Sequence, residues 1–135
     1  MQLMAADDSK KQTRTAELLP LTPAVFHIML ALADGERHGY GIMLEVDRMT
    51  AGQLHLGPGT LYRSIQRMLV DGLIAERKDA VDPEVDDERR RYYRLTPLGL
   101  SVARAEARRL NDLVKVAKKR GLLTKLAAAG TKNRS

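Results

Sequence analysis

Apolar residues recur along the chain at spacings of three and four, which is typical of helices with one buried face. The first such segment follows Thr22 and Pro23. The threonine suits an N-cap and the proline a first helical residue, because first-turn N–H groups have no partner within a helix. Gly35 suits the end of this helix, since glycine readily adopts the left-handed conformation. The expected buried face consists of Val25, Ile28, Met29 and Leu32.

The pattern predicts two more helices in the first half of the chain. One spans residues 39–50 and ends before Gly52, and the other begins at the Gly-Pro-Gly-Thr run of residues 57–60 and ends before Gly72. Between them, residues 53–56 alternate polar and apolar, which predicts a very short strand. The expected buried positions are Ile42, Val46 and Met49 in the first helix and Leu61, Ile65, Met68 and Leu69 in the second.

Residues 73–79 and 89–95 indicate two strands of a β-hairpin, separated by a loop over residues 80–88. Side chains alternate between the two faces of a strand, so Tyr93 and Leu95 share one face. We expect that face to meet the core.

A last helix is predicted from Thr96-Pro97, which repeats the cap and proline of the first helix, to about Arg120. Its apolar residues follow alternating steps of three and four, the pattern of a coiled-coil seam. We expect this seam to be a dimer interface. It consists of Leu100, Ala103, Ala107, Leu110, Val114 and Ala117.

These elements divide the chain into four parts. Residues 1–20 show no clear period and are expected to form a flexible N-terminal arm. Residues 21–96 hold the three short helices and the hairpin, and residues 97–120 form the dimerisation helix. Residues 121–135 are expected to fray. The predicted fold class is mainly α, with a small β-hairpin and a long C-terminal helix.

Composition narrows the classes of function. The formal net charge of +6 and the pI of about 9.8 favour a polyanionic partner, either nucleic acid or an anionic membrane surface. The absence of cysteine excludes disulfides, thiolate zinc sites and thiol catalysis. No apolar run has the length of a signal peptide or a membrane span, so we expect a cytoplasmic protein without a membrane partner.

The sequence offers no candidate catalytic or metal site. No nucleophile, base and orienting residue form a recognisable set, and no Gly-rich phosphate loop ends in Gly-Lys. The three histidines, His27, His38 and His55, lack the spacing of metal ligands. We therefore expect neither an enzyme nor a bound cofactor or metal.

The third predicted helix carries side chains suited to DNA. Arginine can pair with guanine edges and glutamine with adenine, and both can hold phosphates. Glycines at the helix start leave backbone N–H groups accessible to a phosphate oxygen. These helix residues are Gly57, Gly59, Thr60, Tyr62, Arg63, Gln66 and Arg67. The second strand of the predicted hairpin adds Arg89, Arg90, Arg91 and Arg94. The alternatives are an ordinary solvated helix face and a charged edge strand that suppresses aggregation.

Four motifs in this order resemble the PadR family of bacterial transcriptional regulators. They are His-Gly-Tyr-Gly-Ile at 38–42, Gly-Thr-Leu-Tyr at 59–62, Leu-Val-Asp-Gly-Leu-Ile at 69–74 and Arg-Tyr-Tyr-Arg-Leu-Thr-Pro-Leu-Gly at 91–99. The resemblance covers roughly residues 21–120. It implies a winged helix-turn-helix fold and a homodimer joined by C-terminal helices. It also implies binding to palindromic operators in double-stranded DNA, usually as a repressor.

The resemblance also assigns roles to residues. It makes residues 58–71 the recognition helix with Tyr62 in its motif, and it makes Tyr40 a DNA-backbone contact or a core residue. Two features depart from the family. The loop over residues 79–88 is acidic, so phosphates would repel its tip, and the chain lacks the tryptophans between which some members hold flat ligands. If the protein senses a small-molecule inducer, we expect the ligand to bind between the final helix and the DNA-binding part and to change the spacing of the recognition helices.

A protein-docking module is the alternative function. Winged helices also serve as docking domains, and the apolar seam with the acidic loop could join a different partner.

Overall fold

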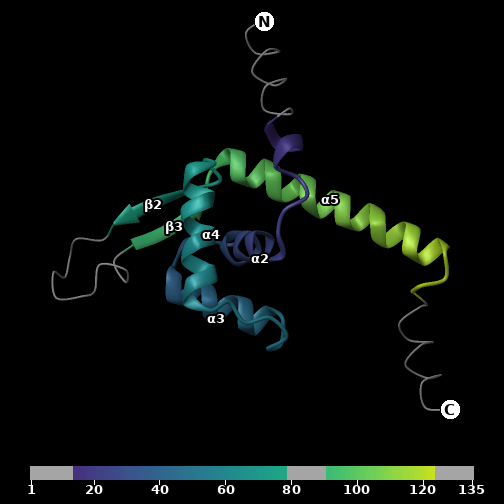
Figure 1. The fold of residues 1–135 in the computed structure, drawn as a ribbon, viewed down its shortest axis with the longest axis horizontal. Helices are drawn as coiled ribbons and strands as arrows, with labels where there is room; N and C mark the ends of the chain where they lie inside the picture. Colours follow the sequence, from purple (N-terminus) through teal and green to yellow (C-terminus); the bar gives the residue numbers. More distant parts are fainter. Residues whose placement is uncertain (1–13, 79–90, 124–135) are drawn as a thin grey trace, which may run out of the picture.

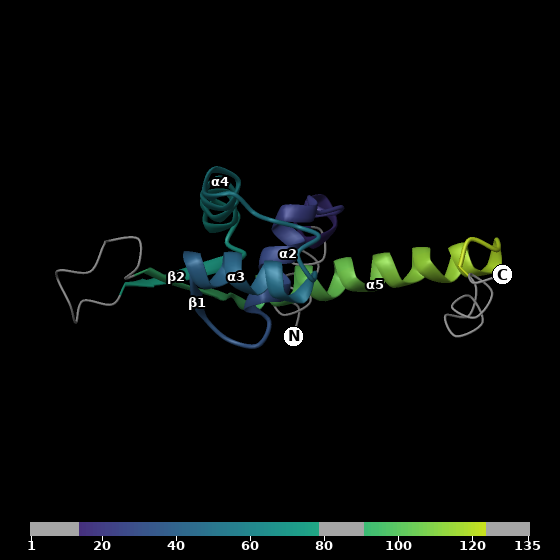
Figure 2. The same ribbon diagram turned by 90° about the horizontal axis from the view of Figure 1, so that it is seen from below.

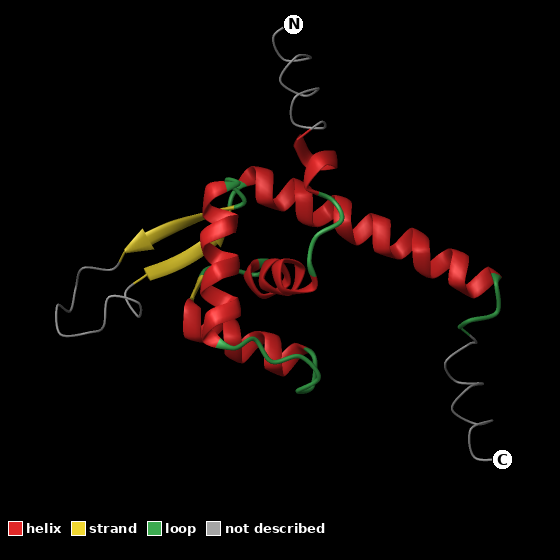
Figure 3. Cartoon of the chain, in the orientation of Figure 1, coloured by secondary structure: helices red, strands yellow, loops and turns green. Residues whose placement is uncertain are grey.

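The computed structural model describes residues 14–78 and 91–123 (Figures 1 and 3). A helical segment at residues 14–18 precedes the other elements. In chain order these are α2 (Pro23–Leu32), β1 (Arg37–His38), α3 (Gly39–Met49), α4 (Pro58–Val70), β2 (Ile74–Lys78), β3 (Arg91–Leu95) and α5 (Pro97–Lys119). The predicted order of three short helices, a hairpin and a long last helix is confirmed.

Two helices begin as the sequence predicts. The Thr22 hydroxyl accepts a hydrogen bond from the backbone N–H of Val25 at 3.2 Å, and the Thr96 hydroxyl accepts one from Gly99 at 3.0 Å. A proline follows each cap, so both helices start with a residue that lacks an N–H and already has a helical φ.

The strands form one antiparallel sheet in the order β1-β3-β2. The sequence analysis missed β1, because two residues are too few to show an alternating pattern. It predicted a strand at residues 53–56 instead, and this prediction is wrong. There the backbone N–H of Leu54 donates to the Thr50 hydroxyl at 3.2 Å, so the segment is held by the preceding turn rather than by a neighbouring strand.

The core lies around α2, which contacts both α4 and α5 (Figure 2). Tyr93 is 2% exposed and Leu95 packs against the core, so the predicted inner face of β3 is confirmed. The fully buried side chains include Ile28 and Met29 of α2, Ile42 and Val46 of α3, Leu61, Ile65 and Met68 of α4, and Val102 of α5.

The end of α4 and the start of α5 meet at a close backbone contact. Gly72, at φ 76°, leads α4 into β2, and its carbonyl accepts a hydrogen bond from the Thr96 hydroxyl at 2.6 Å. A Cβ atom at Gly99 would lie 2.9 Å from the carbonyl carbon of Leu73. Because this neighbour is backbone, α5 can lie this close to β2 only with glycine at position 99.

The expected flexible arm is wrong for its last residues. Residues 14–18 are helical, and Leu18 and Leu19 pack against the core. The Arg14 guanidinium donates to the backbone carbonyl of Asp71 at 2.7 Å, which ties this segment to the end of α4. Residues 1–13 and most of the predicted tail, residues 124–135, lie outside the described residues.

Among the described residues, Glu106 of α5 is the only charged side chain that is buried, at 2% exposed. Its carboxylate accepts a hydrogen bond from Arg109 at 2.6 Å and one from the backbone N–H of Leu21 at 3.0 Å. The hydrogen bond from Arg109 and, after it, that from Leu21 lower the pKa of Glu106, against desolvation, which raises it. Glu106 therefore joins α5 to the segment before α2 in its ionised form.

We expect the substitution Glu106→Gln to lower the free energy of unfolding by about 2 kcal/mol at pH 7, because it removes a charged acceptor from buried hydrogen bonds. The folded-state pKa of Glu106 lies below its ordinary value of 4.5, so the ionised form stabilises the fold above that value. This stabilisation is lost as the pH falls through the folded-state pKa. Urea unfolding of the wild type and of Glu106→Gln should therefore show a difference in the free energy of unfolding that becomes smaller from pH 7 to pH 3.

The matched control is Asp112→Asn, which neutralises an exposed carboxylate on the same helix. It should change the free energy of unfolding by less than about 0.5 kcal/mol. A gap for Glu106→Gln that is the same at every pH would contradict the assigned role of the charge.

Candidate nucleic-acid interface

α4 has one buried and one polar, exposed face, as predicted. Thr60, Arg63, Gln66 and Arg67 are exposed, opposite the apolar residues that enter the core. In Figure 2, α4 lies at the edge of the molecule, on the other side of α2 from α5. Among the described residues, the exposed face of α4 is therefore accessible to a ligand as large as a DNA duplex.

The start of α4 is open as well. A Cβ atom at Gly57 or at Gly59 would meet nothing within 4 Å, and Gly57 caps the helix without a side-chain hydrogen bond. These glycines therefore leave the first turn uncovered, as the sequence analysis expects for a phosphate contact.

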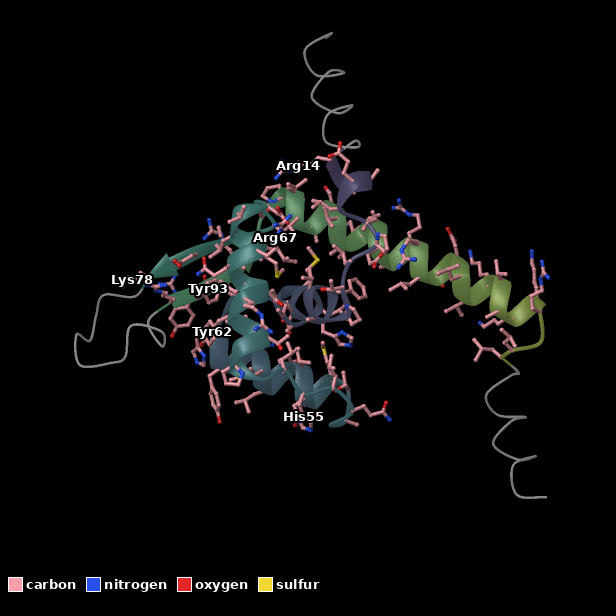
Figure 4. All side chains as sticks on the ribbon, viewed as in Figure 1. Arg14, His55, Tyr62, Arg67, Lys78 and Tyr93 are labelled. Carbon is pink, nitrogen blue, oxygen red and sulfur yellow. The ribbon has the colours of Figure 1, made fainter. Side chains whose placement is uncertain are left out.

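Arg67 lies toward the end of α4 that meets the N-terminal segment, near Arg14 (Figure 4). Its Nε atom pairs with the Asp71 carboxylate at 3.2 Å, while 74% of its side chain is exposed. The pair fixes the Nε atom of Arg67 and leaves most of the side chain exposed to solvent.

Tyr62 differs from the other predicted contacts, because it is half-buried and packs against the core. Its ring lies over Gly39, the first residue of α3. A Cβ atom at Gly39 would lie 2.9 Å from Cζ of Tyr62 and 3.1 Å from Cε1. Tyr62 therefore joins α4 to α3, a contact that the sequence analysis did not predict.

The first turn of α3 is capped by His38, whose Nδ1 atom accepts a hydrogen bond from the backbone N–H of Gly41 at 2.9 Å. The His38 ring also meets the edge of Tyr92 of β3, with ring centroids 5.7 Å apart. Tyr40, in the same turn, is 57% exposed, so its core alternative is wrong. The sequence analysis missed the cap because histidine is not among the usual N-cap residues.

The sheet register divides the predicted arginines of the wing. Arg91 lies opposite Lys78 at the free end of the hairpin, two residues from Tyr93 and therefore on the same face as this core residue. Arg94 lies opposite Ala75 on the other face. Arg89, Arg90 and the acidic loop fall outside the described residues.

The outer face of the sheet carries its own charge cluster. The Arg77 guanidinium lies 4.8 Å from the ring centroid of Tyr92 and pairs with Glu36 at 2.6 Å. Mainly through this hydrogen bond, the pKa of Glu36 is lowered, and the positive charge of Arg94 adds to the effect. Arg94 therefore belongs to this cluster and is separated from the exposed face of α4 by the sheet.

The predicted seam of α5 lies partly on the body of the molecule and partly beyond it (Figures 1 and 2). Ala103 packs against the core, Leu110 and Ala117 are half-buried, and Ala107 is exposed. Leu100 is 38% and Val114 40% exposed. The sequence analysis missed two more exposed apolar side chains of the second half, Leu113 and Val116, because they lie outside the alternating spacing.

In the described part of the chain, no group of three or more histidine, cysteine or acidic side chains is placed to hold a metal ion. Within residues 14–78 and 91–123, none of the helices combines the length and the apolar character needed to cross a membrane.

Comparison with known proteins identifies relatives of the chain. The profile of the transcriptional regulator PadR-like family matches residues 28–105. The transcriptional regulator Rv3488 of Mycobacterium tuberculosis is 34% identical over 89 residues, which cover 66% of this chain and 77% of that protein.

Solved structures share the fold. A transcriptional regulator from Clostridium thermocellum has a TM-score of 0.60 at 25% identity, covering 71% of this chain and 87% of that one. Bacillus subtilis PadR in complex with operator DNA has a TM-score of 0.56 at 19% identity, covering 64% of this chain and 47% of that one.

We expect His38→Ala to lower the free energy of unfolding by about 1 kcal/mol, because α3 loses its N-cap. His38→Asn is the matched control, since asparagine can accept the same backbone hydrogen bond, and it should recover most of the loss. Thermal or urea unfolding at pH 8 measures both. Equal losses for the two variants would show that the ring contact with Tyr92, and not the cap, stabilises this turn.

Proposed function

Because the chain belongs to the PadR-like family of transcriptional regulators, we propose that it binds a palindromic DNA operator as a homodimer and represses transcription. The observation that carries this proposal is the exposed face of α4, which presents Arg63, Gln66 and Arg67 beside an open helix start. Arginine reads guanine and glutamine reads adenine through paired hydrogen bonds in the major groove. The same arginines attract phosphates, so affinity should fall steeply with salt.

In the proposed complex, the other predicted residues hold the protein on the DNA backbone. Backbone N–H groups near Gly57 and Gly59 would meet a phosphate, with the exposed Thr60 and Tyr40 beside them. At the wing, Arg91 would contact the adjacent backbone or groove. Arg94 is left out of the proposed contacts, because it lies on the outer face of the sheet.

We propose that α5 joins two copies of the chain. Its second half carries exposed apolar side chains, Leu113, Val114 and Val116, and a two-fold partner helix would bury them. The dimer would place two α4 helices in successive major grooves, about 34 Å apart. A small-molecule inducer that shifted α5 would change this separation and release the operator.

Selection of random genomic fragments by the purified protein, near physiological salt, tests the proposal. Enrichment of an inverted repeat is expected. Salt-labile retention of all fragments alike would mean binding by charge only, and no retention would favour the protein-docking alternative.

We expect Arg63→Ala/Arg67→Ala to weaken binding to the enriched operator by at least about 30-fold, because each arginine contributes about 1–3 kcal/mol when it reads a base. The matched control is Arg104→Ala/Arg108→Ala, which removes the same charge from exposed positions of α5. Fluorescence anisotropy at fixed salt measures both dissociation constants. Losses of similar size in the two double variants would point to net charge rather than to α4.

We expect Val114→Glu to convert a dimer, with twice the 15.0 kDa mass of the chain, into a monomer. Val114 is exposed in the single chain, so the substitution should spare the folded protomer while placing two carboxylates in the seam. Ser101→Glu, at an exposed position of the same helix, is the control. Light scattering after size exclusion gives the mass, and a dimer that survives Val114→Glu would place the interface elsewhere.

A further inference from the structure

We propose that Tyr62 is a positioning residue that sets the recognition helix against α3, and that it does not read DNA itself. This inference rests on the proposed function. Its basis is the contact between Tyr62 and Gly39, which joins the second turn of α4 to the first turn of α3. A Cβ atom at Gly39 would fall closest to the Tyr62 hydroxyl oxygen, 2.9 Å from Cζ and 3.1 Å from Cε1, so alanine at position 39 would force the ring to move.

The surroundings of Tyr62 separate it from its neighbours on α4. Arg63, Gln66 and Arg67 are exposed, whereas Tyr62 is half-buried and packs against the core. Gly39 beneath it is buried, and His38 caps the same turn of α3. The ring therefore rests on a part of α3 that is itself held by the cap and by the contact of His38 with Tyr92.

The consequence is geometric. Tyr62 is followed directly by Arg63, and Gln66 lies one turn further along the same helix. If the contact between Tyr62 and Gly39 is lost, α4 can shift or tilt relative to α3. Hydrogen bonds to base edges depend on placement within about 0.5 Å, whereas attraction to phosphates tolerates such a shift. Loss of the contact should therefore lower sequence specificity and leave non-specific affinity intact.

A double-mutant cycle tests this inference with the wild type, Gly39→Ala, Tyr62→Ala and the double variant. The dissociation constants for the enriched operator and for a random duplex are measured at the same salt concentration. We expect each single variant to bind the operator about tenfold more weakly, with the random duplex changed less than about twofold. The double variant should bind no more weakly than Tyr62→Ala, because alanine at position 39 then meets no ring.

Tyr62→Phe supplies a readout that needs no change at position 39. It keeps the ring and removes the hydroxyl, so it should stay within about twofold of the wild type for the operator. A loss as large as that of Tyr62→Ala, with the melting temperature of the wild type retained, would mean that the hydroxyl contacts DNA and would overturn the inference. So would losses that multiply in the double variant, or equal losses for operator and random duplex, which would indicate a smaller folded fraction.

Melting temperatures separate this inference from the proposed function. The cost of Gly39→Ala in melting temperature should disappear in the Tyr62→Ala background, whatever the protein binds. If the wild type enriches no sequence, the proposed function fails, and the role of Tyr62 in specificity fails with it. Coupled melting temperatures of the Gly39 and Tyr62 variants would still show that the two residues pack together, so the failure would lie in the proposed function and not in this contact. If the melting temperatures of the two substitutions are coupled but the preference for the operator over the random duplex is unchanged, the positioning role of Tyr62 is overturned while the proposed function stands.

Discussion

The fold depends on the backbone contact at which α4, the hairpin and α5 are joined. Gly72 turns the chain out of α4, and its carbonyl accepts a hydrogen bond from the Thr96 hydroxyl, which also caps α5. The backbone N–H of Thr96 donates to the Leu73 carbonyl at 3.1 Å, and Gly99 leaves no side chain between α5 and that carbonyl. These contacts join the end of α4, both strands of the hairpin and the start of α5, the helix proposed to join two copies.

The ion pairs of the molecule differ in burial. Glu106 is buried and paired with Arg109, whereas the pairs of Glu36 with Arg77 and of Glu45 with Arg48 lie at the surface. Glu106 fixes α5 to the segment before α2 through the backbone N–H of Leu21. The exposed face of α4 keeps cationic side chains directed toward solvent, which suits a polyanionic partner.

These contacts support one account of the proposed function. α4 presents the residues that could read bases, the first turn of α3 supports α4 through Gly39 and Tyr62, and α5 offers apolar surface for a second copy. An event at α5 can reach α4 through the Thr96 junction and through the N-terminal segment, which contacts α5 near Glu106 and α4 at Asp71. Packed and hydrogen-bonded contacts of this kind can carry coupling between two sites.

The sequence by itself determined the helices α2 to α5, the hairpin of β2 and β3, and the resemblance to the family. Helix starts such as Thr22-Pro23 and Thr96-Pro97 were predictable because N-caps and first-turn prolines act locally, and the buried faces were predictable because helical and strand periods are fixed by geometry. Only the tertiary structure decided which polar residues face inward. The cap at His38 is a local contact that was missed because histidine is an unusual N-cap residue, and the outer position of Arg94 follows from strand alternation. The two-residue β1, the buried Glu106 and the contact of Tyr62 with Gly39 instead depend on residues far apart in the chain. No local pattern encodes such contacts, because they form only when separate elements pack together.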